Sequence, residues 1–167
     1  MILNSLRLKL RPLLLSDWEL ISFLRTDNKV NKYVERSSAP TQEEAQNFIF
    51  KIEKGIQSNS LQYWVILIES TKEAIGTICL WNYSKDMKTV EIGYELKPQY
   101  QDKGYMTESM KLVIAFAFET MRFERILAYT HAQNGPSTKL LQKNNFVLRE
   151  GMKDADNANN VIYELNF

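Results

Sequence analysis

The chain has 167 residues, of which 44% are hydrophobic and 25% are charged, a balance typical of one globular domain with a core of its own. Its 21 basic and 20 acidic side chains leave a formal net charge of +1, so it lacks the positive excess with which nucleic-acid-binding proteins neutralise phosphates. No apolar run approaches the roughly 20 residues that span a bilayer. We therefore expect one cytoplasmic domain, residues 1–167, with no nucleic-acid and no membrane partner.

The first third of the chain predicts a strand and two helices. LRLKLRP, residues 6–12, alternates apolar and basic residues, which is the pattern of a half-buried strand. SDWELISFLRT follows with Ser16 and Glu19 at the spacing of a helix-capping box. TQEEAQNFIFKIEKG repeats this spacing with Thr41 and Glu44 and carries an apolar stripe at helical period.

The middle of the chain predicts a sheet. Residues 61–69 and 74–83 are rich in β-branched and aromatic side chains and are joined by a short hairpin connection. The only cysteine, Cys79, lies in the second run, where a buried, unreactive thiol is the usual case. Residues 89–96 alternate between two faces. One face carries Val90, Ile92, Tyr94 and Leu96, and the other carries Glu91 and Glu95.

The last third alternates helix and strand. Residues 107–121 form an apolar stripe at helical spacing, residues 125–131 read as a strand, and a short helix begins near Pro136. FVLREG and VIYELNF are the closing strands. The predicted order is β-α-α-β-β-β-α-β-α-β-β.

The loop QDKGYM, residues 101–106, joins a predicted strand to a predicted helix. The first amide groups of a helix lack partners within it, and the helix dipole adds partial positive charge there, so such a junction binds phosphates well. Gly104 would let the backbone approach a ligand closely, and Lys103 would add a charge. The alternative is that Gly104 is only a turn residue and Lys103 is only solvated.

The loop resembles the Gln/Arg-x-x-Gly-x-Gly/Ala loop of the GNAT superfamily of acyl-CoA-dependent N-acyltransferases, and IGYELKPQYQDKGYMTESM is similar to its RimJ/RimL-type branch. NGPSTKLLQKNNF matches that branch's N-x-x-S-x-x-L-L-x-K-x-G-F pattern through Asn134, Ser137, Leu140, Leu141, Lys143 and Phe146. LRLKLRPLLLSDWE also resembles the family's first strand and helix, so the likeness runs from about residue 6 to residue 167.

The resemblance implies an α/β (α+β) fold, in which a central, mixed, mostly antiparallel, twisted sheet of about 6–7 strands is flanked by about 4–5 helices. It also implies acetyl-CoA as cosubstrate, without a metal, and a homodimer is a possible assembly. The diphosphate would lie on the loop amides, and the pantetheine arm would run along the strand end near Tyr94. The implied coenzyme-binding residues are Tyr94, Leu96, Gln101, Asp102, Lys103, Gly104, Tyr105, Met106, Thr107, Asn134 and Ser137.

The implied reaction is direct attack of an amine on the thioester, for which a carboxylate or a water that it holds would act as base. Glu91 is the first candidate and Glu95 the second, with a solvated strand face as the alternative for both. Ser137 is the candidate proton donor to the departing thiolate; the alternative is an early helix residue that bonds local backbone. Asn134 would bond the pantetheine amides, or would only cap its helix.

Four positions depart from the pattern of the family. Asp102 places a carboxylate in the phosphate loop, Met106 replaces a small residue, and Asn145 replaces a glycine. Leu141 stands where many relatives carry a proton-donating tyrosine. The leading prediction is an acetyltransferase for a protein or peptide N-terminal amine. The alternatives are an enzyme for a polyamine, amino sugar or antibiotic, and a non-catalytic coenzyme-A-binding regulatory module.

Overall fold

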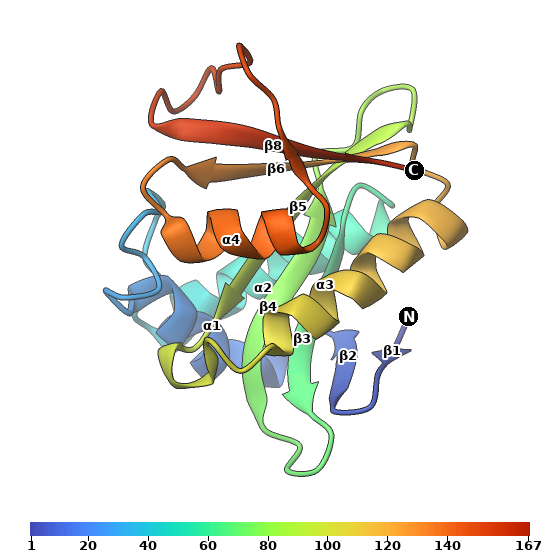
Figure 1. Cartoon of the computed structure of the whole chain (residues 1–167). Helices are drawn as coiled ribbons and strands as arrows, with labels where there is room; N and C mark the ends of the chain where they lie inside the picture. Colours follow the sequence, from blue (N-terminus) through green and yellow to red (C-terminus); the bar gives the residue numbers. More distant parts are fainter.

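The computed structural model describes residues 1–167 and contains one mixed sheet of eight strands (Figure 1). The strands are β1 (Leu3–Asn4), β2 (Leu8–Pro12), β3 (Gln62–Ile68), β4 (Ala74–Trp81), β5 (Thr89–Leu96), β6 (Arg125–His131), β7 (Val147–Leu148) and β8 (Asn160–Asn166). Their order across the sheet is β1-β2-β3-β4-β5-β6-β8-β7, and only the β5–β6 pair is parallel. The predicted mixed, mostly antiparallel sheet is confirmed. It has eight strands where about 6–7 were expected, because β1 contains only two residues, too few for a recognisable pattern, whereas β7 lies within the predicted strand FVLREG.

Helices cover both faces of this sheet. They are α1 (Trp18–Thr26), α2 (Gln42–Gln57), α3 (Tyr105–Ala115) and α4 (Gly135–Lys143). The helices α3 and α4 lie on the near face in Figure 1, and α2 lies behind the sheet. The helix predicted over residues 107–121 is divided, because α3 ends at Ala115 and a π-helical turn follows over Phe116–Thr120. No helix is both long enough and apolar enough to cross a membrane.

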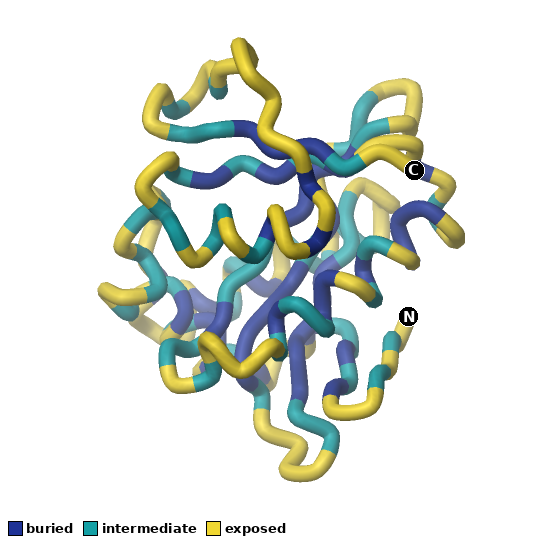
Figure 2. The backbone as a smooth tube through the Cα atoms, in the orientation of Figure 1, coloured by how far each residue is buried: buried dark blue, intermediate teal, exposed yellow.

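The sheet separates two apolar cores. The larger core lies under α3 and α4 and includes Val90, Ile92 and Leu96 from one face of β5. The smaller core lies under α1 and α2 and includes Val65 and Leu67 from β3. The buried stretches follow the central strands, whereas the connecting loops are exposed (Figure 2). The alternation along β5 therefore holds: its apolar residues enter the larger core, and Glu91 and Glu95 face the other side.

The two predicted capping boxes have different outcomes. At α2, the Thr41 hydroxyl accepts a bond from the Glu44 amide at 3.2 Å, and the Glu44 carboxylate accepts one from the Thr41 amide at 3.0 Å, as predicted. The Ser16–Glu19 box is wrong, because α1 begins at Trp18 after a short 3₁₀ turn. Asp17 organises this start instead, since its carboxylate accepts a bond from the Leu14 amide at 2.8 Å.

The strands β5 and β6 separate after a short paired stretch. Their register covers only Thr89–Glu91 against Arg125–Leu127. Beyond it, β5 stays paired with β4 as far as Leu96, and β6 stays paired with β8 as far as His131. The second half of β5 thus has one unpaired edge that faces the gap between the two strands.

Candidate active site

The junction between β5 and α3 has an uncapped helix N-terminus. Gly104 is the N-cap residue with a φ of 79°, and no side chain caps the helix. The amide groups from Gly104 to Thr107 have no acceptor within the protein, and the first to be satisfied is that of Glu108, which donates to the Gly104 carbonyl at 3.1 Å. Free amides at the positive end of a helix form a site for a phosphate group, and a left-handed N-cap is a position that glycine adopts without strain.

The side chains of this loop leave the amides accessible. Gln101 donates to the Leu96 carbonyl at 3.1 Å and so closes the end of β5. Asp102 has a φ of 59°, is exposed, and makes no ion pair. The ammonium group of Lys103 lies 5.5 Å from the centre of the Tyr100 ring. Met106 replaces the small residue of the family pattern, but its side chain is buried in the larger core and does not block the loop.

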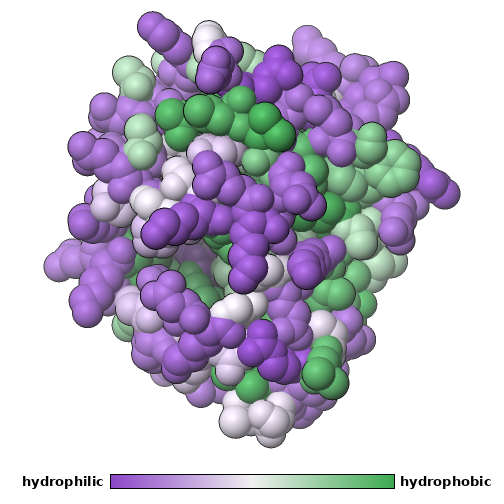
Figure 3. Space-filling view, in the orientation of Figure 1, coloured by the Kyte–Doolittle hydropathy of each residue, from purple (hydrophilic) through white to green (hydrophobic).

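A groove continues from this loop along β5. The space-filling view is hollowed below α4, between that helix and the start of α3 (Figure 3). Since the edge of β5 that faces β6 is unpaired beyond Glu91, its backbone groups are available to an extended ligand. The groove therefore fits a chain of amides such as the pantetheine arm of a coenzyme.

Ser137 stands where α4 meets the two separating strands. Its hydroxyl lies 2.8 Å from that of Tyr94 on β5 and accepts a bond from Thr130 on β6 at 2.9 Å. It therefore bonds side chains of the sheet, not the local backbone that was the alternative reading of this serine. Burial raises the pKa of Tyr94 to about 12, so that phenol keeps its proton near neutral pH.

Asn134 caps α4. Its side-chain oxygen accepts a bond from the Ser137 amide at 3.2 Å, which is the capping role that the sequence left open. The NH₂ group of the same side chain donates to no protein group. The cap thus leaves two N–H donors without a protein partner, which could bond a ligand group such as a pantetheine carbonyl.

Glu91 lies at the vertex where β5 and β6 separate. It is only 9% exposed, so the alternative of a solvated strand face is wrong for this residue. Asn82 donates to one carboxylate oxygen at 2.6 Å, and the other oxygen has no protein partner. Burial raises the pKa of Glu91, the bond from Asn82 lowers it in part, and the charges of Asp154 and Asp156 raise it further. A carboxylate in this state is a stronger base than one in water.

Glu95, the second candidate base, is already engaged. Its carboxylate forms an ion pair with Arg36 at 2.5 Å and accepts a bond from Thr77 at 3.3 Å. Arg36 also donates to the Leu24 carbonyl at the end of α1, at 2.8 Å. Glu95 therefore holds the connection between α1 and α2 against the sheet, and its carboxylate is occupied by two protein partners.

The α1–α2 connection also reaches the end of β6. The ring of Tyr33 lies 5.3 Å from that of His131, whose Nδ1 accepts a bond from the Gln133 amide at 3.1 Å. Trp64 is buried in the larger core, and Trp81, at the end of β4, is 48% exposed. The contact of Tyr33 with His131 thus joins the α1–α2 connection to the end of β6.

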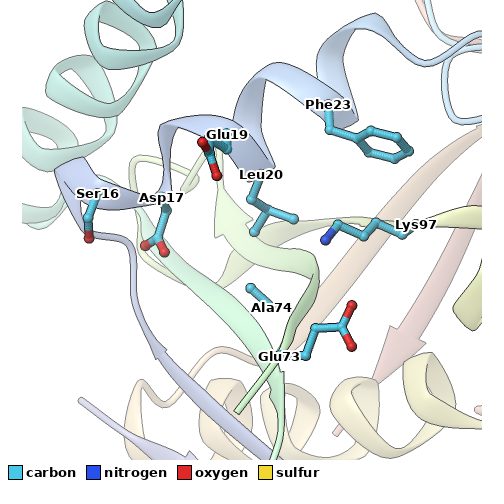
Figure 4. A pocket seen from close by; sticks show the side chains of 8 residues that line it. All are labelled: Ser16, Asp17, Glu19, Leu20, Phe23, Glu73, Ala74 and Lys97. Atoms are coloured by element: carbon cyan, nitrogen blue, oxygen red, sulfur yellow. The ribbon is translucent and has the colours of Figure 1, made fainter. Parts of the chain in front are cut away.

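A cavity of about 370 Å³ lies elsewhere, between α1, the start of β4 and the end of β5 (Figure 4). It is lined by Ser16, Asp17, Glu19, Leu20, Phe23, Glu73, Ala74 and Lys97. None of the residues predicted for coenzyme binding or catalysis lines it. The candidate site is the groove between β5, β6 and α4, and this cavity is separate from it.

Two residues at the phosphate loop escaped sequence reasoning. Arg7, from the turn between β1 and β2, and Glu108, from the first turn of α3, form an ion pair at 2.6 Å beside Gly104. They are separated by 101 residues in the chain, and neither has a local pattern that indicates the other. Only the packing of α3 against the sheet edge brings them together.

A match to a known protein family over most of the chain agrees with this geometry. The features that agree are the free amides, the positive φ of Gly104 and the two parallel strands that separate. Residues 7–147 match the model of the Acetyltransferase (GNAT) domain. The chain belongs to the GNAT acetyltransferase family. Members of this family use acetyl-CoA, so the protein is an N-acetyltransferase that takes its acetyl group from this coenzyme and gives it to an amine.

Individual relatives agree with the GNAT assignment. The uncharacterized N-acetyltransferase YnaD of Bacillus subtilis (strain 168) is 29% identical over 141 residues, which cover 84% of this chain and 79% of that protein. A GNAT-family acetyltransferase structure from Bacillus anthracis superposes with a TM-score of 0.82 at 26% identity, covering 99% of this chain and 98% of that one. RimL, a ribosomal L7/L12 alpha-N-protein acetyltransferase in complex with coenzyme A, superposes with a TM-score of 0.85 at 21% identity, covering 99% and 98%. At that identity, the RimL comparison shows a shared fold.

Proposed function

We propose that this GNAT enzyme acetylates the N-terminal α-amine of a protein or peptide, by direct attack of the amine on acetyl-CoA in a ternary complex. The observation that carries the coenzyme site is the row of unbonded amides from Gly104 to Thr107, next to the unpaired edge of β5. The diphosphate would bind the amides, and the pantetheine arm would extend β5 as an added strand.

Glu91 is the proposed base. An α-amino group has a pKa near 7.7–8.0, so about a tenth of it is uncharged at pH 7, and a carboxylate or a water that it holds can take the proton that the amine must lose. The uncharged amine nitrogen forms a bond to the thioester carbon, the carbon–sulfur bond breaks, the nitrogen loses one proton to Glu91, and the sulfur gains one through Ser137. Glu91 then releases its proton to solvent and Ser137 regains one from solvent, so that the enzyme returns to its starting state. The raised pKa of Glu91 suits this step better than that of an exposed glutamate.

Ser137 is the proposed donor to the departing sulfur. A hydroxyl has one proton and two lone pairs. Thr130 donates to one lone pair, and Tyr94, which stays protonated, can donate to the other, so the Ser137 proton is free to bond the thiolate. The thiolate of coenzyme A has a thiol-like pKa around 8.5 and needs only modest help. This hydroxyl supplies the role for which Leu141 has no functional group.

The acceptor class rests on less direct support. The fold shared with RimL, an alpha-N-protein acetyltransferase, favours a peptide acceptor. A small cationic amine is the second candidate, because the carboxylates of Asp154 and Asp156 act on Glu91 and so make this region acidic. A non-catalytic coenzyme-A-binding role is the third.

A thiol-release assay with acetyl-CoA separates these functions. The acceptor panel contains peptides with free N-termini, the same peptides with blocked N-termini, polyamines and aminoglycosides. We expect release with the free peptides and none with the blocked ones. Thiol release with polyamines or aminoglycosides alone would show that the acceptor is a small amine and not a peptide. Thermal stabilisation by acetyl-CoA without turnover of any acceptor would leave only the binding role.

A further inference from the structure

The loop that carries the free amides is held from outside by a residue of the N-terminal turn. Arg7 lies between β1 and β2, and its guanidinium reaches across to the start of α3. One of its nitrogens, Nη1, donates to the Lys103 carbonyl at 3.2 Å. The guanidinium also lies 4.8 Å from the centre of the Tyr105 ring. Arg7 therefore touches the residues on both sides of Gly104.

The other donors of Arg7 are directed at Glu108. The Nε group donates to Oε2 at 2.7 Å, and Nη2 lies 2.6 Å from the same oxygen. The backbone amide of Arg7 donates to Oε1 at 3.1 Å, and the Ser5 hydroxyl donates to it at 2.5 Å. All the protein contacts of this carboxylate thus come from the β1–β2 turn.

The bond to Lys103 fixes the direction of the next amide. The carbonyl of Lys103 and the amide of Gly104 belong to one planar trans peptide unit, so they point in opposite directions. Since Arg7 holds the carbonyl, the Gly104 amide must point away from Arg7. The space on this side is also limited, because a Cβ on Gly104 would lie 3.4 Å from Nη2 of Arg7.

The ion pair also sets the charge at the helix end. Glu108 is an anion in the first turn of α3, where it would repel a diphosphate if it stood alone. Burial acts to raise the pKa of Glu108, but the bonds from Ser5 and Arg7 outweigh it and hold that pKa below its usual value, so the group stays ionised. Arg7 supplies the opposite charge, and the pair as a whole leaves the positive end of the helix available.

We propose that Arg7 is a positioning residue for acetyl-CoA: by holding the Lys103 carbonyl and neutralising Glu108, it orients the loop amides for the diphosphate. This inference rests on the coenzyme site of the proposed function. It requires the planar fork of arginine, because one side chain must bond a carboxylate and a carbonyl simultaneously. A lysine, with a single nitrogen on a flexible stem, would keep the charge without this geometry.

Two acetyl donors test this role. Acetyl-CoA carries the diphosphate, and acetyl-pantetheine carries the same thioester without it. In Arg7→Gln we expect kcat/KM for acetyl-CoA to fall about tenfold, mainly through KM, with acetyl-pantetheine changed less than about twofold. Arg7→Lys should show nearly the same selective loss, because the fork is absent.

Arg11→Gln is the matched control. Arg11 lies on β2 and its side chain bonds only Asp17, at 2.7 Å, and the Pro12 carbonyl, so its loss should lower stability and leave the ratio of the two donors unchanged. Equal losses with both donors in Arg7→Gln would mean that Arg7 only supports the fold. Full activity of Arg7→Lys would mean that charge alone matters. Either result, or an unchanged Arg7→Gln enzyme, would overturn the inference while leaving the proposed function intact. Failure of the wild type to use or bind either form of the coenzyme would instead overturn the proposed function itself.

Discussion

The N-termini of α2 and α3 differ in whether their first backbone amides have hydrogen-bond acceptors. Every helix begins with amides that lack partners inside it. At α2, Thr41 and Glu44 satisfy two of them in a reciprocal capping box. At α3, the N-cap is Gly104, which has no side chain, and the amides as far as Thr107 stay open. The closed end stabilises the chain, whereas the open end is the proposed place for the coenzyme diphosphate.

The two ends also differ in what surrounds them. The cap of α2 comes from within four residues and needs no other part of the protein. The open end of α3 is held by Arg7 and Ser5, about a hundred residues away, through Glu108. An uncapped helix end that distant residues hold in one orientation is stronger evidence for a ligand site than an uncapped end alone. We therefore expect that adding a cap to α3 lowers coenzyme binding, and that removing the cap from α2 lowers the stability of the fold.

The largest effect is expected when α3 receives an acidic cap. Gly104→Asp places a carboxylate beside the diphosphate, and two unit charges about 4 Å apart at a protein surface interact by about 4 kcal/mol. Coenzyme A affinity should fall about a thousandfold, since each 1.4 kcal/mol is a factor of ten. Isothermal titration calorimetry with coenzyme A measures this loss.

The matched control is Gly151→Asp. Gly151 also has a positive φ, of 82°, and no atom lies within 4 Å of the position of an added Cβ. The variant carries the same backbone strain and the same charge at a distance from α3. Comparable loss of affinity in both variants would show that the effect is not local to the helix end.

The next largest effect separates turnover from binding. Glu91 lies at the vertex of the groove, not at the helix end, so Glu91→Gln should lower kcat about a hundredfold, as the loss of a general base does, and leave coenzyme A affinity unchanged. Stopped assays of thiol release and calorimetry on the same sample measure the two quantities. An unchanged kcat would remove Glu91 from the mechanism.

Glu91 also makes a prediction about stability and pH. Burial raises its pKa in the folded state, so the ionised form costs stability above that pKa, and the cost disappears as the pH falls through it. The neutral Glu91→Gln side chain avoids this cost. The variant should unfold at a higher temperature than the wild type near pH 8, with the advantage lost at acidic pH in thermal melts.

A smaller effect is expected at the partly closed N-terminus of α4. Ser137→Ala removes the proposed proton donor but keeps the Asn134 cap, because that cap binds the backbone amide of residue 137. We expect kcat to fall about tenfold, since a leaving thiolate needs only modest assistance. The control is Thr138→Ala, whose hydroxyl bonds only the Gly135 carbonyl in its own helix. If the two variants had equal kcat values, Ser137 would have no special role.

The smallest effect on function is expected at α2. Thr41→Ala removes a cap of a kind worth about 1 kcal/mol of stability. Coenzyme A affinity and kcat should stay at the wild-type values, because the bonds of Thr41 and Glu44 are made to each other and not to residues of the candidate site. Urea unfolding gives the stability change. A simultaneous loss of coenzyme affinity would break the contrast between the two helix ends.

Local patterns predicted the parts of this fold that depend on neighbours in the chain. The alternation along β5, the capping box of α2 and the strand-to-helix loop at Gly104 follow from residues within one or two turns of each other. The predictions that failed concern features that depend on contacts between segments distant in the chain. Asp17, held by Arg11 of β2, took over the start of α1 from Ser16, and the unpredicted two-residue strand β1 exists only because β2 pairs with it.

The sequence by itself determined the alternating elements, the glycine at the loop and the motifs that indicate a GNAT enzyme. The tertiary structure alone decided that Glu91 is buried and Glu95 is bound by Arg36, although both lie on the same face of one strand. It also decided that Arg7 bonds the Lys103 carbonyl and Glu108 beside Gly104. The reason is that hydrogen bonds within a few residues are fixed by local geometry, whereas the environment of a charge depends on which distant segments pack around it.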